Sequence, residues 1–321
     1  MEIVFLGTPE FAIPALVALN ESDNHRIVGV ITQPDRPRGR GKKLSPPPVK
    51  VAALEAGLPL HQTAEVNAEE TLGWVRERSP LIGVVVAFGQ FIKKPLREIP
   101  LHGFVNLHAS LLPKYRGAAP IHAAILSGDQ ETGVSIMRVE KRMDAGEVFA
   151  RASLPIQRDE NVGELTTRLA ELGADWMVRV MDDIEAGRAV SEPQDESMAT
   201  HVPRIGREDR RVLWDRPART IHNQVRGLTP HPGAVSSFRP SRSSEPFAVR
   251  ITRTSLVSGD KEEVGEPGTV MGVTAGASGR GIRVSVPGGG LRILRLVAAG
   301  GRELDGVEFI NGRGKGGGRF V

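Results

Sequence analysis

An amide, an imidazole and a carboxylate near the middle of the chain have the chemistry of an acyl-transfer site. Asn106 and His108 alternate with apolar residues in Phe-Val-Asn-Leu-His (104–108), and Asp144 follows in Met-Asp-Ala-Gly-Glu (143–147). An amide can donate to an oxygen that gains negative charge, and an imidazole can move a proton near neutral pH. A carboxylate can fix the tautomer and basicity of that imidazole. Asn106, His108 and Asp144 are therefore candidate catalytic residues, in a reaction that needs no activated side-chain nucleophile.

These three side chains can meet only if the surrounding elements bring them to one place. The apolar run before His108 predicts a short buried strand, which Pro113 and Gly117 end. Alternation along that strand places Asn106 and His108 on one face near its carboxyl end, the edge at which open α/β sheets bind ligands. Taken alone, this pair is also compatible with a structural role. Asp144, in a predicted turn between two further strands, favours the catalytic interpretation.

The strands and helices around this segment predict an α/β domain. The strands are expected at 2–7, 27–32, 81–88, 104–107, 133–139 and 147–156, and the helices at 49–56, 68–77, 118–126 and 161–187. The apolar run 81–88 is typical of a central parallel strand buried on both faces. We expect a Rossmann-like, mostly parallel sheet with helices on both faces. Thr8 and Pro9 suit the N-cap and first residue of a helix, and Gly-Thr-Pro-Glu (7–10) lacks the later glycines of a dinucleotide-binding turn.

The rest of the chain predicts a second, smaller domain. One helix at 217–227 is followed by five short strands punctuated by glycines, at 234–239, 246–256, 268–274, 281–286 and 291–297. This pattern is typical of a small, OB-like β-barrel, a class that often binds nucleic acid. A polar stretch without periodicity precedes it. We divide the chain into a catalytic domain (1–189), a linker (190–207) and a C-terminal domain (208–321).

Charge is distributed unevenly along the chain. Residues 204–321 contain 20 Lys and Arg against 11 Asp and Glu, a net charge of +9, whereas residues 1–203 carry a net charge of −5. A basic domain on an otherwise acidic protein suggests a polyanionic partner, although basic charge also serves solubility alone.

A second basic segment, here called the arm, spans residues 33–48. Its cations, separated by glycines and prolines, are Arg36, Arg38, Arg40, Lys42 and Lys43. No helix or strand periodicity runs through the arm, and loops of this length inside a compact domain are usually functional or disordered. We expect an irregular segment that orders when the phosphates of a nucleic acid neutralise its charge. A solvated linker is the alternative.

Composition argues against several other classes of protein. The chain has no cysteine, which excludes disulfides and thiolate metal sites, and its eight histidines are scattered without metal-ligand spacing. No apolar run approaches the roughly 20 residues of a membrane-spanning helix. The start of the sequence lacks the basic region of a signal peptide. We expect a monomeric, cytoplasmic protein with no metal and no membrane association.

Several motifs resemble those of the formyltransferases that use 10-formyltetrahydrofolate. They are Asn106-Leu-His108, the adjoining Ser110-Leu-Leu-Pro113 and, further along, Asp144. The resemblance implies that Asn106, His108 and Asp144 are the catalytic trio. It also implies that the folate is contacted by Ser110, Leu111, Leu112 and Pro113. Gly89, at the end of a neighbouring predicted strand, would let a flat ligand approach the backbone closely, although a plain turn explains this glycine equally well.

Within that family the similarity is greatest to the members that formylate the amino group of methionine on initiator tRNA. It extends over nearly the whole chain, from Phe5-Leu-Gly-Thr-Pro-Glu-Phe11 through the arm to Arg226-Gly-Leu-Thr-Pro-His-Pro232. This implies an enzyme of translation initiation whose arm and basic C-terminal domain contact charged initiator tRNA. Two alternatives stay open. A non-catalytic RNA-binding protein would explain the charge but not the trio, and a formyltransferase for a sugar-nucleotide or other small amine would not need the arm.

Overall fold

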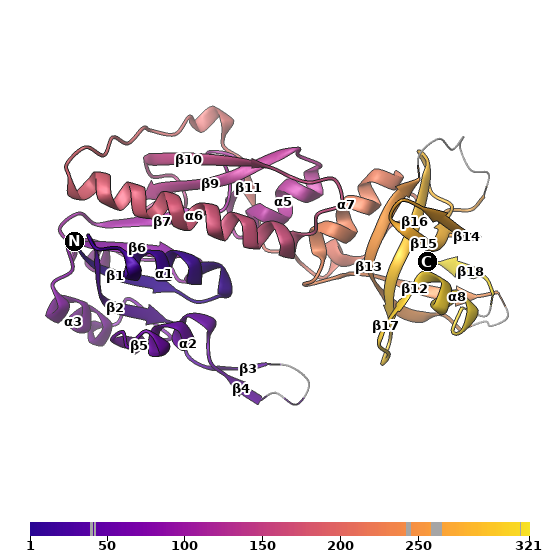
Figure 1. Ribbon diagram of the computed structural model, residues 1–321, viewed down its shortest axis with the longest axis horizontal. Coiled ribbons are helices and arrows are strands. Elements are labelled where there is room, and N and C mark those ends of the chain that lie inside the picture. Colours follow the sequence, from indigo (N-terminus) through magenta and orange to yellow (C-terminus); the bar gives the residue numbers. More distant parts are fainter. Residues whose placement is uncertain (39–40, 42, 242–244, 258–264, 315) are drawn as a thin grey trace. The chain divides into compact units, whose positions relative to one another are not determined.

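The structure is a computed structural model that describes residues 1–38, 41, 43–241, 245–257, 265–314 and 316–321. The chain forms two compact units, which are described separately (Figure 1). Unit 1 comprises residues 1–120, 131–154 and 166–202, and unit 2 comprises residues 121–130, 155–165 and 203–321. The predicted domain boundaries at 189 and 208 stay a prediction.

Unit 1 is built on a seven-stranded sheet in the order β10-β9-β7-β6-β1-β2-β5. Its strands are β1 (Glu2–Gly7), β2 (Arg26–Thr32), β5 (Leu60–Gln62), β6 (Ile82–Val86), β7 (Phe104–His108), β9 (Glu131–Arg138) and β10 (Val148–Pro155). The strands from β7 to β5 run parallel to their neighbours, and β9 runs antiparallel to β7. All five residues of β6 are buried, as the uninterrupted apolar run predicts for a central strand. The predicted mostly parallel α/β sheet is confirmed.

Helices pack against both faces of this sheet. They are α1 (Ile13–Glu21), α2 (Pro48–Glu55), α3 (Glu69–Arg78), α4 (Lys94–Arg97) and α6 (Val162–Glu185). On one face, α3 shares a buried apolar cluster with Val4 and Leu6 of β1. On the other face, α6 lies so close to β7 that a Cβ atom on Gly173 would come within 2.6 Å of Leu107. The same alternation that places Leu107 against α6 directs Asn106 and His108 to the opposite face.

The start of the first helical segment differs from the prediction. A 3₁₀ turn (Glu10–Ala12) precedes α1, its N-cap is Pro9, and no side chain caps it. Thr8 instead donates its hydroxyl to the carbonyl oxygen of Phe88 at 3.1 Å. The predicted N-cap role of Thr8 is therefore wrong: Pro9 is the N-cap, and the Thr8 hydroxyl bonds instead to the loop that follows β6.

The arm contains two short strands that the sequence did not predict. Strands β3 (Arg36–Arg38) and β4 (Lys43–Ser45) pair antiparallel, with Arg36 opposite Ser45 and Arg38 opposite Lys43. The expectation of a segment without strands is thus wrong for these residues. Arg40 and Lys42 lie outside the described residues.

Residues 190–202, here called the strap, lie along the loops that follow β7 and β9. Strand β11 (His201–Val202) pairs parallel with β8 (Arg116–Gly117), which lies in the loop after β7. Glu192 exchanges two backbone hydrogen bonds with Val148, the first residue of β10. Much of the stretch predicted as a linker is therefore held by unit 1.

Unit 2 contains a curled antiparallel sheet and the helices α5 (Pro120–Ser127), α7 (Ala218–Leu228) and α8 (Gly306–Asn311). The order β14-β15-β16-β13-β12-β18 runs through β12 (Ala234–Pro240), β13 (Phe247–Val257), β14 (Val270–Gly276), β15 (Gly279–Val284), β16 (Gly290–Ala298) and β18 (Gly318–Phe320), and β17 (Glu303–Asp305) pairs with β16. A bridge between Thr269 and Arg319 joins the two edge strands. The sheet therefore curls into a barrel-like form around an aromatic cluster of Phe238, Phe309 and Phe320.

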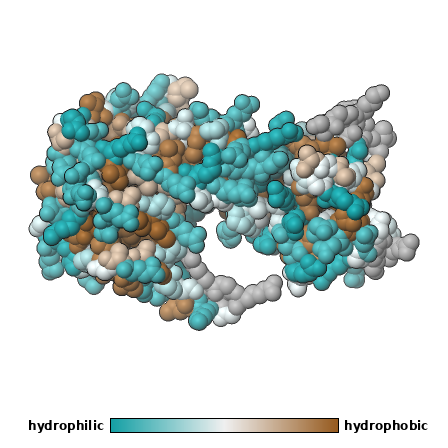
Figure 2. Space-filling view, in the orientation of Figure 1, coloured by the Kyte–Doolittle hydropathy of each residue, from teal (hydrophilic) through white to brown (hydrophobic). Residues whose placement is uncertain are grey.

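On the face shown in Figure 2, hydrophilic residues predominate and hydrophobic residues are scattered among them. Among the described residues, no helix is both long enough and apolar enough to cross a membrane.

Candidate active site

His108 ends β7 and is almost fully buried. Its Nδ1 atom lies 3.8 Å from Oδ2 of Asp144, and its Nε2 atom lies 2.9 Å from the carbonyl oxygen of Tyr115. Because a carbonyl oxygen can only accept, Nε2 carries the hydrogen of that contact. The ring therefore has an acceptor on each side, and an imidazolium could donate to both.

Asp144 reaches the ring from the turn between β9 and β10. Its Oδ2 atom accepts a hydrogen bond of 2.8 Å from the backbone N–H of Gly117, in the loop after β7. The backbone of Asp144 has φ = 52°, in the left-handed region that L-residues seldom occupy. Such conformations persist at sites where surrounding contacts determine them. Two loops far apart in the sequence thus meet at one carboxylate.

Asn106 lies two residues before His108 on the same face of β7. Its neighbours in register are Val85 on β6 and Met137 on β9, and its side chain is half-buried. Two residues of strand span roughly 7 Å, so the amide and the imidazole lie along one line at the sheet edge. The structure therefore brings together the three residues predicted as catalytic, while their roles stay a prediction.

The predicted folate segment leaves β7 directly beyond His108. Ser110 is fully buried, and its hydroxyl donates to the carbonyl oxygen of Lys114 at 2.6 Å. Leu112 is buried, and its backbone N–H donates to Ser135 Oγ while its carbonyl oxygen accepts from Arg151 Nε. The side chain of Leu111 packs against Gly133, and a cis peptide bond joins Leu112 to Pro113. The hydrogen bonds of Leu112 thus hold the segment against β9 and β10.

Gly89, the other residue predicted to contact folate, follows β6, the parallel neighbour of β7. It has φ = 84°, and a Cβ atom at this position would lie 3.3 Å from Nε2 of Gln33. Since the carboxyl ends of neighbouring parallel strands meet at one edge, Gly89 and residues 110–113 lie at the same edge of the sheet.

Among the arm's five predicted phosphate-binding residues, Arg36 and Lys43 have side chains that the structure describes, and both are exposed. Its base is fixed by Asp35, which accepts hydrogen bonds from Gln62 (2.8 Å) and Lys50 (2.9 Å). The Gln62 hydrogen bond, followed by the Lys50 hydrogen bond, lowers the pKa of Asp35. The binding of phosphates by the arm is not tested by this geometry and stays a prediction.

Comparison with known proteins decides the family. Residues 1–181 match the family described as formyl transferase, and residues 204–314 match the formyl transferase C-terminal domain. The chain belongs to the formyl transferase family. The predicted family is thereby confirmed.

Curated relatives of this formyl transferase align along almost their whole length. The methionyl-tRNA formyltransferase of Moorella thermoacetica is 46% identical over 92% of this chain and 94% of the relative. That of Trichlorobacter lovleyi is 42% identical over 97% of this chain and 93% of the relative. An N-formyltransferase from Helicobacter canadensis, solved with folinic acid and dTDP-3-aminofucose, is similar in structure. It has a TM-score of 0.64 and 17% identity, covers 91% of this chain and 98% of its own, and therefore supports the fold alone.

Three residues beside the candidate site of this formyl transferase, Arg116, Gln194 and Glu196, were not singled out from the sequence. Arg116 is fully buried and donates to Gln194 and Glu196 of the strap. Hydrogen bonds from Arg116, and then from Arg142, lower the pKa of Glu196 to about 2. The sequence gives no signal of this network, because Arg116 is a single cation in a loop and the strap residues show no periodicity.

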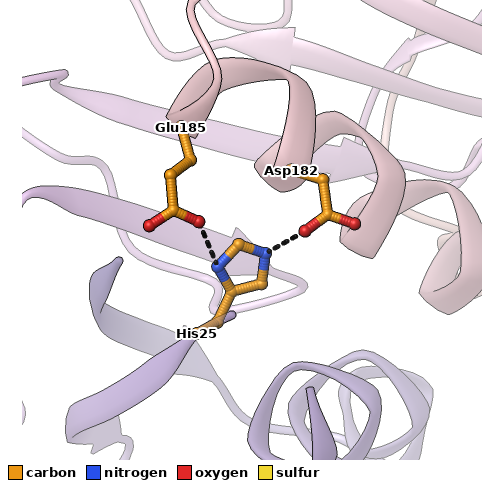
Figure 3. A group of neighbouring side chains, drawn as sticks. All are labelled: His25, Asp182 and Glu185. Atoms are coloured by element: carbon orange, nitrogen blue, oxygen red, sulfur yellow. Dashed lines mark ion pairs between the residues drawn. The ribbon is translucent and has the colours of Figure 1, made fainter. Parts of the chain in front are cut away.

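A cluster of titratable side chains elsewhere in unit 1 has a structural explanation (Figure 3). Nε2 of His25 lies 3.3 Å from Asp182 Oδ1, and its Nδ1 lies 3.6 Å from Glu185 Oε2. Burial lowers the pKa of His25, and Asp182 and Glu185 oppose that lowering. Asp182 also accepts from Asn24, and Glu185 from the Met1 amine. These carboxylates already have donors, so we assign the cluster to holding the end of α6 rather than to a metal.

A cavity of about 700 Å³ in unit 1 lies away from the candidate site. It is lined by residues that include Gly103, Phe104 and Arg138. Phe104 begins β7 and His108 ends it, so roughly 13 Å of strand separates this cavity from the imidazole. The cavity is therefore distinct from the predicted folate site.

Proposed function

We propose that this chain transfers a formyl group from 10-formyltetrahydrofolate to the amino group of methionine on initiator tRNA. The observation that carries the proposal is the near full-length match, at 46% and 42% identity, to proteins named methionyl-tRNA formyltransferase. The meeting of Asn106, His108 and Asp144 at the sheet edge supports it, because these are the groups that acyl transfer to an amine needs.

Each member of the trio has a role that its chemistry suits. The folate supplies the formyl group when it is bound. Asn106 would donate an amide N–H to the formyl oxygen as negative charge develops there. As an imidazolium, His108 would stabilise the same charge and give a proton to the leaving nitrogen. The neutral imidazole that results would take up the proton released by the attacking amine. Asp144, held by the Gly117 N–H, would keep the ring oriented.

The loops after β6 and β7 suit a flat, polar pterin. The positive φ of Gly89 and the absence of a side chain there expose its backbone at the sheet edge. Ser110–Pro113 would form the opposite wall through backbone groups, because the Ser110 hydroxyl already donates within its own loop. A folate-bound structure with the pterin remote from both loops would contradict this assignment.

A tRNA acceptor accounts for the charge of the protein and bears on its location and oligomeric state. A tRNA acceptor gives a reason for the exposed cations of the arm and for the net charge of +9 in residues 204–321. It also implies a cytoplasmic enzyme that acts alongside the translation machinery. A monomer is sufficient, because one chain carries the trio, the arm and the basic domain.

The decisive experiment is an acceptor comparison. Purified protein would be incubated with 10-formyltetrahydrofolate and either charged initiator methionyl-tRNA, uncharged tRNA or an amino-sugar nucleotide, and the consumption of 10-formyltetrahydrofolate measured. We expect turnover with the charged tRNA alone. Turnover with the amino-sugar nucleotide would support the alternative function, and tRNA binding without any turnover would support a non-catalytic RNA-binding protein.

A further inference from the structure

Gln194, in the middle of the strap, joins two loops of the candidate site. Its Nε2 atom donates to the carbonyl oxygens of Asp144 at 2.9 Å and Gly146 at 2.7 Å. Its Oε1 atom accepts from Nε of Arg116 at 3.1 Å and from Nη2 at 2.8 Å. A carboxamide has both donors and an acceptor, and here it uses both kinds at once. The orientation of the side chain is therefore fixed.

One partner of Gln194 is the backbone of Asp144 itself. Asp144 has a φ of 52°, and its own carbonyl oxygen is the group that Gln194 holds. A strained conformation of this kind persists only where neighbouring contacts determine it. Because the Asp144 carboxylate approaches His108 from this turn, the direction of the turn sets the direction of the carboxylate.

The other partner, Arg116, stands between two residues whose backbone groups contact His108 and Asp144. Tyr115, just before it, has a φ of 61° and offers its carbonyl oxygen to Nε2 of His108. Gly117, just after it, donates its N–H to Asp144 Oδ2. The strap also fixes this loop through Thr200, whose Oγ1 atom accepts from the Tyr115 N–H at 2.8 Å.

The guanidinium of Arg116 is a suitable anchor because it is buried and each of its three nitrogen atoms donates a hydrogen bond. Its Nη2 and Nη1 atoms lie 2.9 Å and 3.2 Å from the two carboxylate oxygens of Glu196, in addition to the Gln194 contacts. A two-point Arg–carboxylate pair fixes both position and orientation. Gln194 thereby connects the guanidinium of Arg116, which Glu196 holds, to the left-handed backbone of Asp144.

We propose that Gln194 is a positioning residue, which sets the Asp144 carboxylate and the Tyr115 carbonyl on opposite sides of the His108 ring. The inference rests on the proposed function, because it gives the trio its catalytic role. Gln194 itself touches none of the three catalytic side chains through its hydrogen bonds; it acts through the Asp144 backbone and through Arg116.

The test is the variant Gln194→Glu. A carboxylate can still accept from Arg116 but has no N–H for the carbonyl oxygens of Asp144 and Gly146. We expect kcat for charged initiator tRNA to fall about 10- to 100-fold, because a displacement of about 1 Å at a catalytic group can cost that much. The KM for tRNA and the Kd for folate should stay within about threefold of the wild type, since neither binding surface changes. If the added charge prevents folding, Gln194→Met replaces this variant. In either case, folate binding measures the concentration of folded protein from which kcat is calculated.

Two controls separate positioning from a general loss of structure. Ser191→Ala removes another hydrogen bond of the strap, from Ser191 Oγ to Glu147 Oε2 at 2.6 Å, which lies outside the trio. It should leave kcat unchanged. In an Asp144→Asn background, Gln194→Glu should cause little further loss, because residues that act through one another are non-additive.

The outcomes are distinct. A wild-type kcat in Gln194→Glu, or an equal fall in Ser191→Ala, would overturn the inference. So would additive losses in the double variant with Asp144→Asn. If Asp144→Asn and Asn106→Ala themselves retain full formyl transfer, the proposed catalytic site fails instead, whatever Gln194 does.

Discussion

The Nδ1 atom of His108 lies 3.8 Å from Oδ2 of Asp144, although the strands β8 and β9 and the helix α5 separate the two residues along the chain. This distance is longer than an N–H···O hydrogen bond. Catalytic contacts are often long in the absence of substrate and tighten when it binds. The pair is therefore close enough to work together, while the Gly117 N–H and the Tyr115 carbonyl hold its two members from either side.

Loss of either proposed oxyanion donor should slow formyl transfer without weakening tRNA binding. We expect Asn106→Ala and His108→Ala each to lower kcat about 10²- to 10³-fold, the usual cost of removing one such donor. Steady-state kinetics with charged tRNA and filter binding of the same tRNA would measure both quantities. His102→Ala is the matched control, because His102 is exposed and precedes the amino end of β7. Near-normal turnover of His108→Ala would refute the assignment.

Removal of charge from the arm should weaken the use of tRNA alone. We expect Arg40→Ala, Lys42→Ala and Lys43→Ala together to lower kcat/KM for charged tRNA and to reduce the slope of log affinity against log salt by about 2 to 3. Folate binding should be unchanged. A control that removes three cations elsewhere on unit 1 combines Arg76→Ala, Lys93→Ala and Lys94→Ala. Equal slopes of log affinity against log salt for the two triple variants would indicate that the arm is a solvated linker.

Two facing cations in unit 2 are expected to bind phosphate. Arg253 on β13 lies directly opposite Arg295 on β16, and both side chains are exposed. Like charges in this position repel each other. Glu303, whose Oε2 lies 3.9 Å from Nη1 of Arg295, offsets part of that repulsion, and a bound phosphate would offset more. We expect Arg253→Ala with Arg295→Ala to weaken tRNA binding and to leave folate binding intact, as measured by tRNA titration at several salt concentrations. Arg302→Ala with Arg313→Ala is the matched control, and an identical loss in both pairs would argue against a specific phosphate site.

His222 should make the stability of unit 2 depend on pH. It is buried, its Nδ1 lies 2.9 Å from Thr254 Oγ1, and burial lowers its pKa below the ordinary value of 6.5. Arg226 and Arg158 also lower that pKa, while Asp159 and the Arg158 backbone oppose them. The unfolded chain then binds more protons than the folded chain below pH 6.5, so the free energy of unfolding should fall as the pH drops through that value.

The substitution His222→Gln should reduce this fall by up to about 1.4 kcal/mol per pH unit, the limit for one proton. Urea unfolding between pH 5 and 8 would measure the slope for both proteins. The exposed His102→Gln is a suitable control. An unchanged slope in His222→Gln would show that another group is responsible.

Local sequence determined the elements that depend on periodicity. The apolar run before His108 predicted β7, and strand alternation alone placed Asn106 and His108 on one face. The uninterrupted apolar run 81–88 likewise predicted the central strand β6, and a helix was predicted at 161–187, where α6 lies. Such elements can be predicted because apolar residues mark the buried positions. Backbone geometry makes those positions recur about every 3.6 residues in a helix and every second residue in a strand.

The tertiary structure alone decided which distant polar groups meet. Thr8 bonds to Phe88 rather than capping its own helix, and β3 pairs with β4 although neither segment has strand periodicity. Gln194 lies in a stretch whose sequence reads as a linker, yet it holds Arg116 and the backbone of Asp144. A hydrogen bond depends on the distance and direction between two atoms, which no single stretch of sequence records. The trio could therefore be proposed as catalytic from the sequence, but the contacts that position its side chains could not be predicted.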